Sequence, residues 1–103
     1  MELKKMLVGL EGLKVKGNLE IDIQNITTDS RKVTKGTLFI AIKGFQVDGH
    51  DFIMQAIEQG AICVMVEAGA NLKRLGIPEE ITLIVAPDTR YAEAIVACNF
   101  YEE

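Results

Sequence analysis

One stretch of the sequence, from Ile26 to Phe52, combines hydroxyl side chains, basic side chains and glycine turns around an apolar segment. Thr28, Ser30 and Arg31 come just before a turn, where their side chains and backbone amides can face a phosphate or a ribose. An Asp-Ser-Arg turn is also a common structural element, so both interpretations stay open on composition alone. The pattern indicates an anion-binding edge without a catalytic base.

Phosphoryl transfer by this chain alone is not expected. A P-loop needs Gly-x-x-x-x-Gly-Lys-Ser/Thr, because the amides cradle phosphate, the lysine neutralises it and the hydroxyl holds magnesium. Two glycine pairs have this spacing, Gly12 with Gly17 and Gly44 with Gly49, but neither is followed by lysine and a hydroxyl residue. No Gly-x-Gly-x-x-Gly fingerprint for a dinucleotide occurs either. We therefore predict no catalytic residue and no ATP hydrolysis here.

Each of the remaining polar candidates can be interpreted either as a structural residue or as a functional one. His50 lies where a helix is expected to begin, so it is either a neutral polar turn residue or a ligand contact. Asp48 and Gly49 form either a turn with a helix cap, or a cap that holds the preceding loop open toward a ligand. Asp29 and Asp51 could form an acid pair, but no nucleophile or second histidine completes such a site.

Length and charge narrow the class of protein. A chain of 103 residues with 49% apolar and 25% charged residues has room for one ordered domain. Its net charge of −4 argues against a general nucleic-acid surface, although a local basic patch would escape this count. The sequence has no apolar run of about 18 residues and no signal-peptide pattern, so we expect no membrane partner and a cytoplasmic location.

The two cysteines, Cys63 and Cys98, have no CxxC spacing and no second metal ligand nearby. Both are predicted to be buried, reduced thiols that pack as small apolar side chains. A disulfide or a metal site is the alternative, and we predict no metal site.

Hydrophobic periodicity places these residues on an α/β framework. Three largely apolar runs are typical of buried strands: Leu38 to Ile42, which is apolar throughout, Ile62 to Val66 and Ile81 to Ala86. Three segments have helical patterns: Asp51 to Gln59, Ala70 to Leu75, and the segment after a cap at Asp88 or Thr89. Strands joined through helices pair in parallel, and ligands of such sheets lie beyond the carboxyl ends of the strands.

The N-terminal region has a different pattern. Glu2 to Leu10 is predicted to form a short amphipathic helix. Leu19 to Gln24 alternates apolar and polar residues, which predicts a strand, with Leu13 to Lys16 as its partner across a Gly17-Asn18 turn. The expected fold over residues 1–103 is therefore a small three-layer, Rossmann-like α/β domain. Its mainly parallel βαβαβ sheet follows an N-terminal helix and short antiparallel strands. The last helix runs to Glu103 without a glycine cap or a proline stop, so we expect the chain to be part of a longer polypeptide.

The ordered motifs of the whole chain resemble the N-terminal domain of the Mur ligases, and within them the UDP-N-acetylmuramoyl-tripeptide synthetases. The motifs are Thr28-Asp29-Ser30-Arg31-Lys32-Val33, Gly36-Thr37-Leu38-Phe39-Ile40-Ala41-Ile42-Lys43-Gly44, Asp48-Gly49-His50-Asp51-Phe52-Ile53, Ala56-Ile57, Gly60-Ala61, Pro87-Asp88-Thr89-Arg90 and Asn99-Phe100-Tyr101. As an ordered set they are far more specific than any one of them.

The resemblance implies that five residues contact the UDP moiety of the substrate. Thr28 and Ser30 match positions that contact the uridine diphosphate, while Phe45, Gln46 and Val47 match the loop that closes on the same nucleotide. A serine hydroxyl suits a pyrophosphate and a phenyl ring suits uracil. The family also has histidine at the position of Phe45.

The implied function is to bind the UDP moiety of UDP-MurNAc-L-Ala-D-Glu for an ATP-dependent amide-forming ligase that adds the third amino acid of the peptidoglycan stem. ATP and magnesium belong to the full enzyme, in a central domain whose Gly-Thr-Asn-Gly-Lys-Thr loop this sequence lacks, so this chain holds no cofactor. The central and C-terminal domains would be its partners, and they would select lysine or diaminopimelate. The alternatives are the equivalent domain of the sister ligase that adds D-Ala-D-Ala, or a free-standing, non-catalytic α/β binding module.

Overall fold

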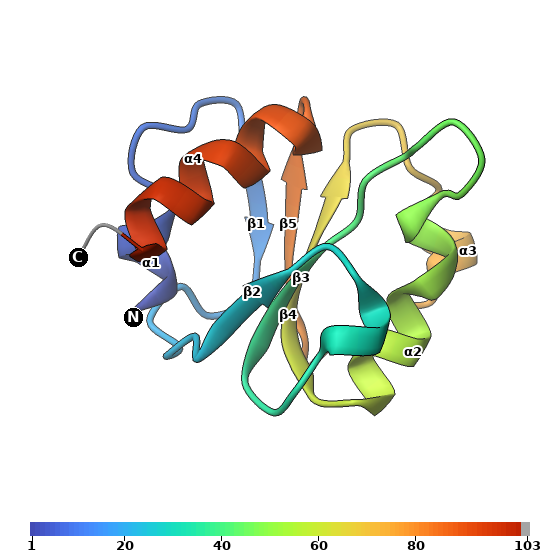
Figure 1. The fold of residues 1–103 in the computed structure, drawn as a ribbon, viewed down its shortest axis with the longest axis horizontal. Coiled ribbons are helices and arrows are strands. Elements are labelled where there is room, and N and C mark those ends of the chain that lie inside the picture. The colour runs from blue at the N-terminus through green and yellow to red at the C-terminus, as the bar shows by residue number, and fades with distance from the viewer. Residues whose placement is uncertain (102–103) are drawn as a thin grey trace.

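Five strands form a single sheet in the computed structural model, which describes residues 1–101 (Figure 1). The strands are β1 (Lys14–Lys16), β2 (Asn25–Thr27), β3 (Thr37–Ile40), β4 (Ala61–Glu67) and β5 (Thr82–Ala86). Their order across the sheet is β1-β5-β4-β3-β2, with β2 to β5 parallel and β1 antiparallel to β5. The predicted parallel βαβαβ arrangement is confirmed.

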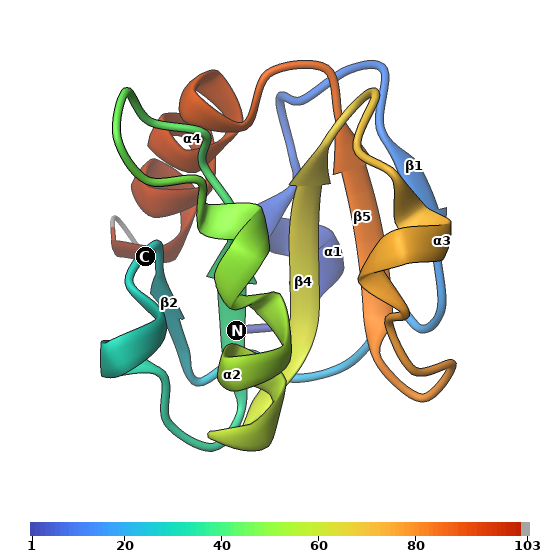
Figure 2. The same ribbon diagram turned by 90° about the vertical axis from the view of Figure 1, so that its right-hand side faces the viewer.

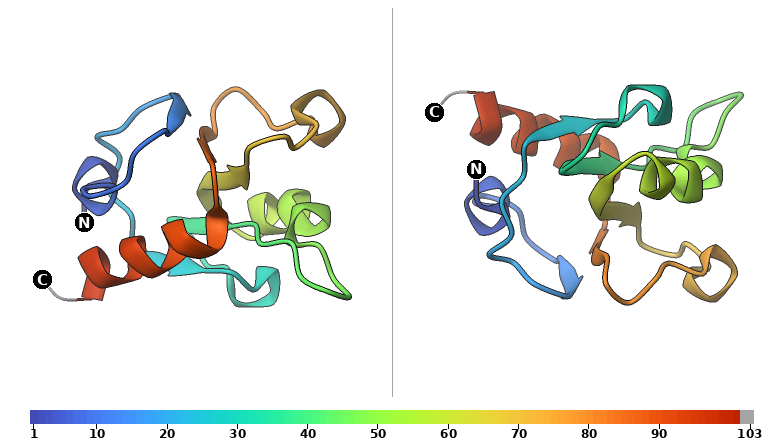
Figure 3. Two further views of the ribbon diagram at one scale, coloured as in Figure 1. Left: turned by 90° about the horizontal axis from the view of Figure 1, so that it is seen from above. Right: turned by 90° about the horizontal axis from the view of Figure 1, so that it is seen from below.

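The helices cover both faces of the sheet and make it a three-layer domain. They are α1 (Leu3–Met6), α2 (Ile53–Glu58), α3 (Leu72–Leu75) and α4 (Thr89–Tyr101), together with the 3₁₀ helices η1 (Ser30–Lys32) and η2 (Gly49–Phe52). Seen from above and from below, α1 and α4 lie on one face, and α2 and α3 lie on the other (Figure 3). The side view shows α2 and α3 on the face of the sheet turned toward the viewer, one to each side of β4 (Figure 2).

Alternate residues of the central strands build two separate cores. Leu38 and Ile40 of β3 face the core shared with α1 and α4, whereas Phe39 faces the core shared with α2. All three are essentially inaccessible to solvent, which agrees with the prediction of a strand covered on both faces. Each such side chain contributes roughly 1.5–3 kcal/mol through burial, so β3 is fixed firmly beneath the segments that follow it.

Polar caps fix the ends of the helices around the carboxyl edge of the sheet. Asp48 accepts from the backbone N–H of His50 and caps η2, as the sequence predicts for this turn. Asp88 accepts from the backbone N–H of Tyr91 in the first turn of α4. Glu67, the last residue of β4, accepts from both the backbone N–H and the hydroxyl of Thr89. The end of β4 is therefore tied to the start of α4.

The predicted strand over Leu19 to Gln24 is wrong. This segment is irregular, and its carbonyl groups serve α1: the backbone N–H groups of Leu3 and Lys4 donate to the carbonyls of Ile21 and Leu19, both at 2.9 Å. Only one isolated antiparallel bridge, Glu2 with Asp22, remains. The alternation arises because leucine and isoleucine side chains pack against the core while the backbone binds the helix start instead of a neighbouring strand.

Two more N-terminal expectations need correction. The helix predicted for Glu2 to Leu10 is confined to Leu3–Met6, and Leu10 packs against the core from a turn. The strand predicted within Leu13 to Lys16 exists as β1, but its partner is β5 and not the following segment. Gly17, directly after β1, lies against β5, because a Cβ at this position would be only 2.8 Å from the hydroxyl oxygen of Thr82.

The two cysteines lie in different environments. Cys63 is completely buried in the core beneath α1 and α4, as predicted. Cys98 is exposed on α4, which corrects the prediction that both are buried. Ala92 and Val96 form the buried side of α4, and Cys98 lies on the side that faces solvent. No helix within residues 1–101 is long and apolar enough to cross a membrane.

Candidate nucleotide-binding site

A cleft of about 520 Å³ opens at the carboxyl ends of the neighbouring strands β2 and β3. Three segments supply its walls: the turn after β2, the end of β3 with the loop that follows, and the first residues of the η2–α2 helical segment. The lining residues are Thr28, Asp29, Ser30, Arg31, Phe39, Ile42, Val47, Gly49, Phe52 and Gln55. This is the edge at which open α/β sheets bind ligands.

An ion pair shapes the turn after β2. Asp29 caps η1 by accepting from the backbone N–H of Arg31, and the same carboxylate binds the guanidinium through two further contacts at 3.0 and 2.9 Å. The side-chain hydrogen bond from Arg31 is the main reason why the pKa of Asp29 falls from 3.8 to about 2. The carboxylate is therefore ionised at neutral pH, and the arginine is held beside the cleft.

Ser30 has a buried but weakly engaged hydroxyl. The residue is only 6% exposed, and its carbonyl accepts from the side-chain amide of Gln59 at 2.6 Å. Its hydroxyl lies 3.5 Å from the side-chain oxygen of Gln55, which is much longer than an ordinary O–H···O bond. The backbone of Ser30 is thus fixed by α2, while its hydroxyl can still donate to a ligand in the cleft.

The loop at residues 43–48, here called the 43–48 loop, stands between β3 and η2. It is closed by a hydrogen bond from the N–H of Gly44 to the carbonyl of Val47 at 2.8 Å and by an antiparallel bridge between Lys43 and Asp48. Val47 lines the cleft although 58% of it is exposed. Phe45 at the tip is completely exposed.

The structure brings some of the five predicted contact residues together and leaves others apart. Thr28, Ser30 and Val47 line the same cleft, although they come from two separate segments of the sequence. Phe45 and Gln46 are exposed on the 43–48 loop beside the cleft and do not line it in the chain without ligand. The contacts of all five residues with a nucleotide stay predictions.

Two residues of the cleft were missed by sequence reasoning, Phe52 and Gln55. Phe52 ends η2 and Gln55 lies in the first turn of α2, and their spacing of three positions places them on one side of the helical segment. Phe52 is 37% exposed at the cleft. A polar Gln55 on the same face as Phe52 was the available signal that this first turn faces a cleft and not the core.

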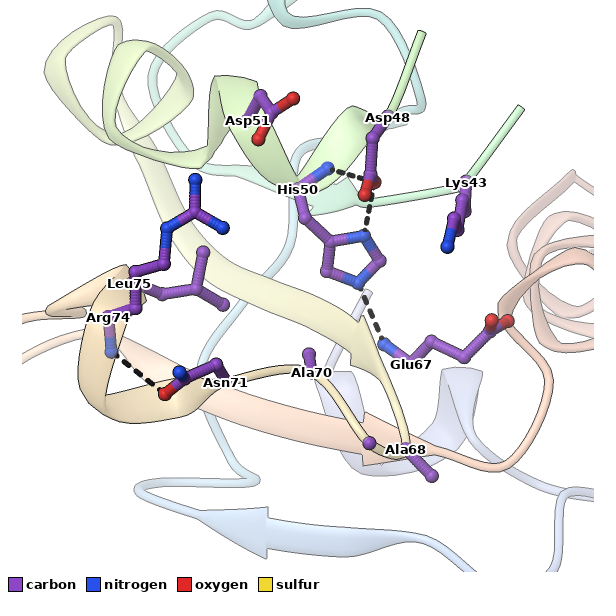
Figure 4. A pocket seen from close by; sticks show the side chains of 11 residues that line it. Lys43, Asp48, His50, Asp51, Glu67, Ala68, Ala70, Asn71, Arg74 and Leu75 are labelled. Carbon is purple, nitrogen blue, oxygen red and sulfur yellow. Dashed lines mark hydrogen bonds and ion pairs between the residues drawn. The ribbon is translucent and has the colours of Figure 1, made fainter. Parts of the chain in front are cut away.

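A second cavity of about 310 Å³ lies on the other side of the 43–48 loop, at the carboxyl end of β4 (Figure 4). Lys43 and Arg74 line it together with Asp51 and Glu67. His50 also lines it, between Asp48 and the backbone of Glu67. Within residues 1–101, no group of three or more histidine, cysteine or acidic side chains lies close enough together to hold a metal ion.

Comparison with known sequences identifies the family. Residues 22–100 match the family described as Mur ligase family, catalytic domain. The match covers most of the chain, including all three segments that form the cleft. The chain therefore belongs to the Mur ligase family.

The similar sequences carry the names of ligases that act on one kind of substrate. The chain is 50% identical over 101 residues to UDP-N-acetylmuramoyl-L-alanyl-D-glutamate--2,6-diaminopimelate ligase of Clostridioides difficile (strain 630). This alignment covers 98% of the chain and 20% of that ligase. The chain is also 42% identical over 96 residues to UDP-N-acetylmuramyl-tripeptide synthetase 2 of Oceanobacillus iheyensis. That alignment covers 90% of the chain and 19% of the relative. The chain thus spans about a fifth of the curated relatives that it matches.

A solved structure with the same fold comes from the same family. The crystal structure of MurF from Acinetobacter baumannii matches with a TM-score of 0.61 and 32% sequence identity. The match covers 78% of this chain and 16% of the MurF chain. The Rossmann-like α/β fold expected from the sequence is confirmed by this match.

Proposed function

We propose that this chain binds the UDP moiety of UDP-MurNAc-L-Ala-D-Glu as the N-terminal domain of an ATP-dependent ligase that adds the third residue of the peptidoglycan stem. One observation carries the proposal: Thr28, Ser30 and Val47, from two segments of the sequence, line one cleft at the carboxyl ends of β2 and β3. The names of the similar ligases point to the same class of substrate.

The chemistry of the cleft suits a nucleoside diphosphate. The hydroxyls of Thr28 and Ser30 supply donors for pyrophosphate or ribose oxygens. A guanidinium carries five N–H donors, and the side-chain contacts of Arg31 with Asp29 use two of them, so others remain for a phosphate. Phe45 offers an exposed aromatic face that can close over the base from the 43–48 loop.

Titration calorimetry with UDP-MurNAc-L-Ala-D-Glu and with UDP tests the proposal on the 103-residue chain. We expect weak binding, because the other domains of the ligase contribute no contacts and the loop must order around the ligand. Ser30→Ala should weaken binding by roughly tenfold to a hundredfold, the effect of losing one hydrogen bond to a charged ligand. Lack of binding by the unsubstituted chain would overturn the proposed function.

Thr34→Ala is a matched control for Ser30→Ala. Thr34 carries a hydroxyl on an exposed residue near β3, but it precedes this strand and therefore lies at the opposite end from the cleft. Its removal should leave nucleotide affinity within about twofold of the original value. Equal affinities for the Ser30→Ala and Thr34→Ala chains would exclude Ser30 from the site.

The relatives favour a diaminopimelate-adding ligase as the complete enzyme. Sequence identity reaches 50% with a ligase that is named for 2,6-diaminopimelate, compared with 32% for MurF, the sister enzyme. ATP and magnesium would be bound by a central domain, and this chain would act by positioning the substrate at a distance from the reacting atoms. Translated sequence following codon 103 should contain a Gly-Thr-Asn-Gly-Lys-Thr loop, and the pure chain should not turn over ATP.

A further inference from the structure

A nearly buried imidazole joins the 43–48 loop to the end of β4. The His50 side chain is 11% exposed, and its Nδ1 lies 2.7 Å from a carboxylate oxygen of Asp48. On the other side of the ring, the backbone N–H of Glu67 donates to Nε2 at 3.0 Å (Figure 4). Both ring nitrogens are therefore used in contacts between separate parts of the fold.

The partners determine the protonation of His50. A backbone N–H can only donate, so Nε2 accepts from Glu67 and carries no proton, which leaves the proton on Nδ1 facing Asp48. Burial raises the pKa of Asp48, but the hydrogen bonds from the backbone and ring of His50 outweigh it, so that this pKa is lowered overall. The result is a neutral Nδ1–H imidazole that donates to an ionised carboxylate.

Both ends of the 43–48 loop are anchored near the start of α4. At one end, the carbonyl of Lys43 accepts from the guanidinium of Arg90 at 3.3 Å. At the other end, Asp48 is held by His50, whose second contact is the backbone of Glu67. The side chain of Glu67 binds Thr89, and Arg90 is the next residue. Both anchors therefore reach the first two residues of α4.

We propose that His50 is a positioning residue for the 43–48 loop: it fixes the loop so that Val47 lines the nucleotide cleft and Phe45 and Gln46 stand beside it. The ring lines the second cavity and not the cleft, so any effect of His50 on nucleotide affinity must pass through the loop. The purpose of this positioning rests on the proposed function, whereas the anchoring itself is a property of the chain without ligand.

The anchoring can be measured without a nucleotide. Phe45→Trp puts a fluorescent reporter at the exposed tip of the loop, in a chain that has no other tryptophan. In that background, His50→Asn keeps a donor for Asp48 but removes the acceptor for Glu67, and we expect it to lower the steady-state anisotropy of the indole. Asp51→Asn, an exposed change in the same cavity, should leave the anisotropy unchanged.

Calorimetry with UDP-MurNAc-L-Ala-D-Glu, in chains that keep Phe45, then measures the consequence for binding. His50→Asn should weaken binding on the order of tenfold, and Asp51→Asn should change it by less than about twofold. A drop in loop anisotropy without unfolding, checked by circular dichroism, separates loop anchoring from a general loss of structure. The ¹⁵N chemical shifts of the ring in the unsubstituted chain should show a protonated Nδ1 and an unprotonated Nε2.

The outcomes separate this inference from the proposed function. Unchanged anisotropy in the His50→Asn chain, or a protonated Nε2 in the folded chain at neutral pH, would overturn the positioning role. If the unsubstituted chain binds no nucleotide, the proposed function fails, while the anisotropy and the ring shifts still decide whether His50 anchors the loop. If His50→Asn does not fold, the ring shifts decide alone.

Discussion

The side-chain amide of Asn99 donates to the backbone carbonyl of Met6 at 2.8 Å, and it also reaches the carbonyl of Val8 at 2.8 Å. Asn99 lies near the end of α4, and the two carbonyls belong to the last turn of α1 and the residues after it. One amide therefore satisfies two acceptors that the short helix α1 leaves without an internal partner.

Asn99→Ala should lower the free energy of unfolding by about 1–2 kcal/mol, because both hydrogen bonds are lost from a partly buried site. Urea denaturation followed by circular dichroism measures this change. Asn99→Asp is the informative companion, since it keeps the shape but places carboxylate oxygens against carbonyl oxygens. It should destabilise the chain at least as much as alanine does, and full stability of the Asn99→Asp chain would contradict the assigned contacts.

Gly60 closes the turn between α2 and β4 at a position where no other residue fits. Its φ is +123°, and a Cβ there would lie 2.7 Å from the Cα of Lys35 and 2.9 Å from its nitrogen. Gly60→Ala should therefore destabilise the chain by about 2 kcal/mol or more, through backbone strain and a backbone clash together. Thermal and urea unfolding of the substituted chain would measure the loss.

Gly76 provides the matched control for Gly60. It ends α3 with φ +60° and ψ +38°, but a Cβ at this position meets no atom within 4 Å. Gly76→Ala should cost only about 1 kcal/mol, the strain of a left-handed conformation without a clash. Equal losses for the two substitutions would show that the contact of Gly60 with Lys35 is unimportant.

The Asp29–Arg31 pair makes folding depend on pH in the acid range. Because the folded pKa of Asp29, about 2, lies below its usual 3.8, the pair stabilises the fold above about pH 4. That contribution is lost as the pH falls from about 4 toward 2. An NMR titration of the Asp29 carboxyl should give a midpoint near 2, and Arg31→Gln should move it back toward 3.8. A midpoint near 3.8 in both chains would contradict the observed pair.

The thiol of Cys63 should be inert in the folded chain. Complete burial raises its pKa and also shields the sulfur from reagents. In a Cys98→Ser chain, the Cys63 thiol should react with a disulfide reagent at neutral pH roughly a thousandfold or more slowly than it does in denaturant. The reaction in the folded chain requires the core to open first. A Cys63→Ser chain, which retains the exposed Cys98, supplies the fast reference.

The framework of the fold was predictable where burial is strongest. The runs that became β3, β4 and β5 are largely apolar because helices cover both faces of the sheet, so the sequence indicates them clearly. The alternation of Leu19 to Gln24 is compatible with a half-buried coil as well as with a strand, so the pattern alone could not distinguish the two. The three-residue strand β2 is too short to produce a periodic signal, and it was missed.

The candidate site was predictable only in part. The hydroxyl residues of one turn and the glycines of a loop indicated an anion-binding site. Residue types alone could not show that Thr28 and Val47 line one cleft, because this depends on the pairing of β2 with β3. From the sequence, His50 could be interpreted either as a turn residue or as a ligand contact. Its structural role depends on a backbone N–H of Glu67, seventeen positions away, and no side-chain pattern reports such a partner.

The two borders of the sheet have a further consequence. At one border, β1 has only three residues, and all three are exposed, with Lys14 and Lys16 on either side of Val15. At the other border, β2 is equally short. A strand from a second molecule would need a long, flat, uncharged edge on which to add, and neither border offers one. The domain therefore resists edge-to-edge aggregation even though its central strands are among the most apolar segments of the chain.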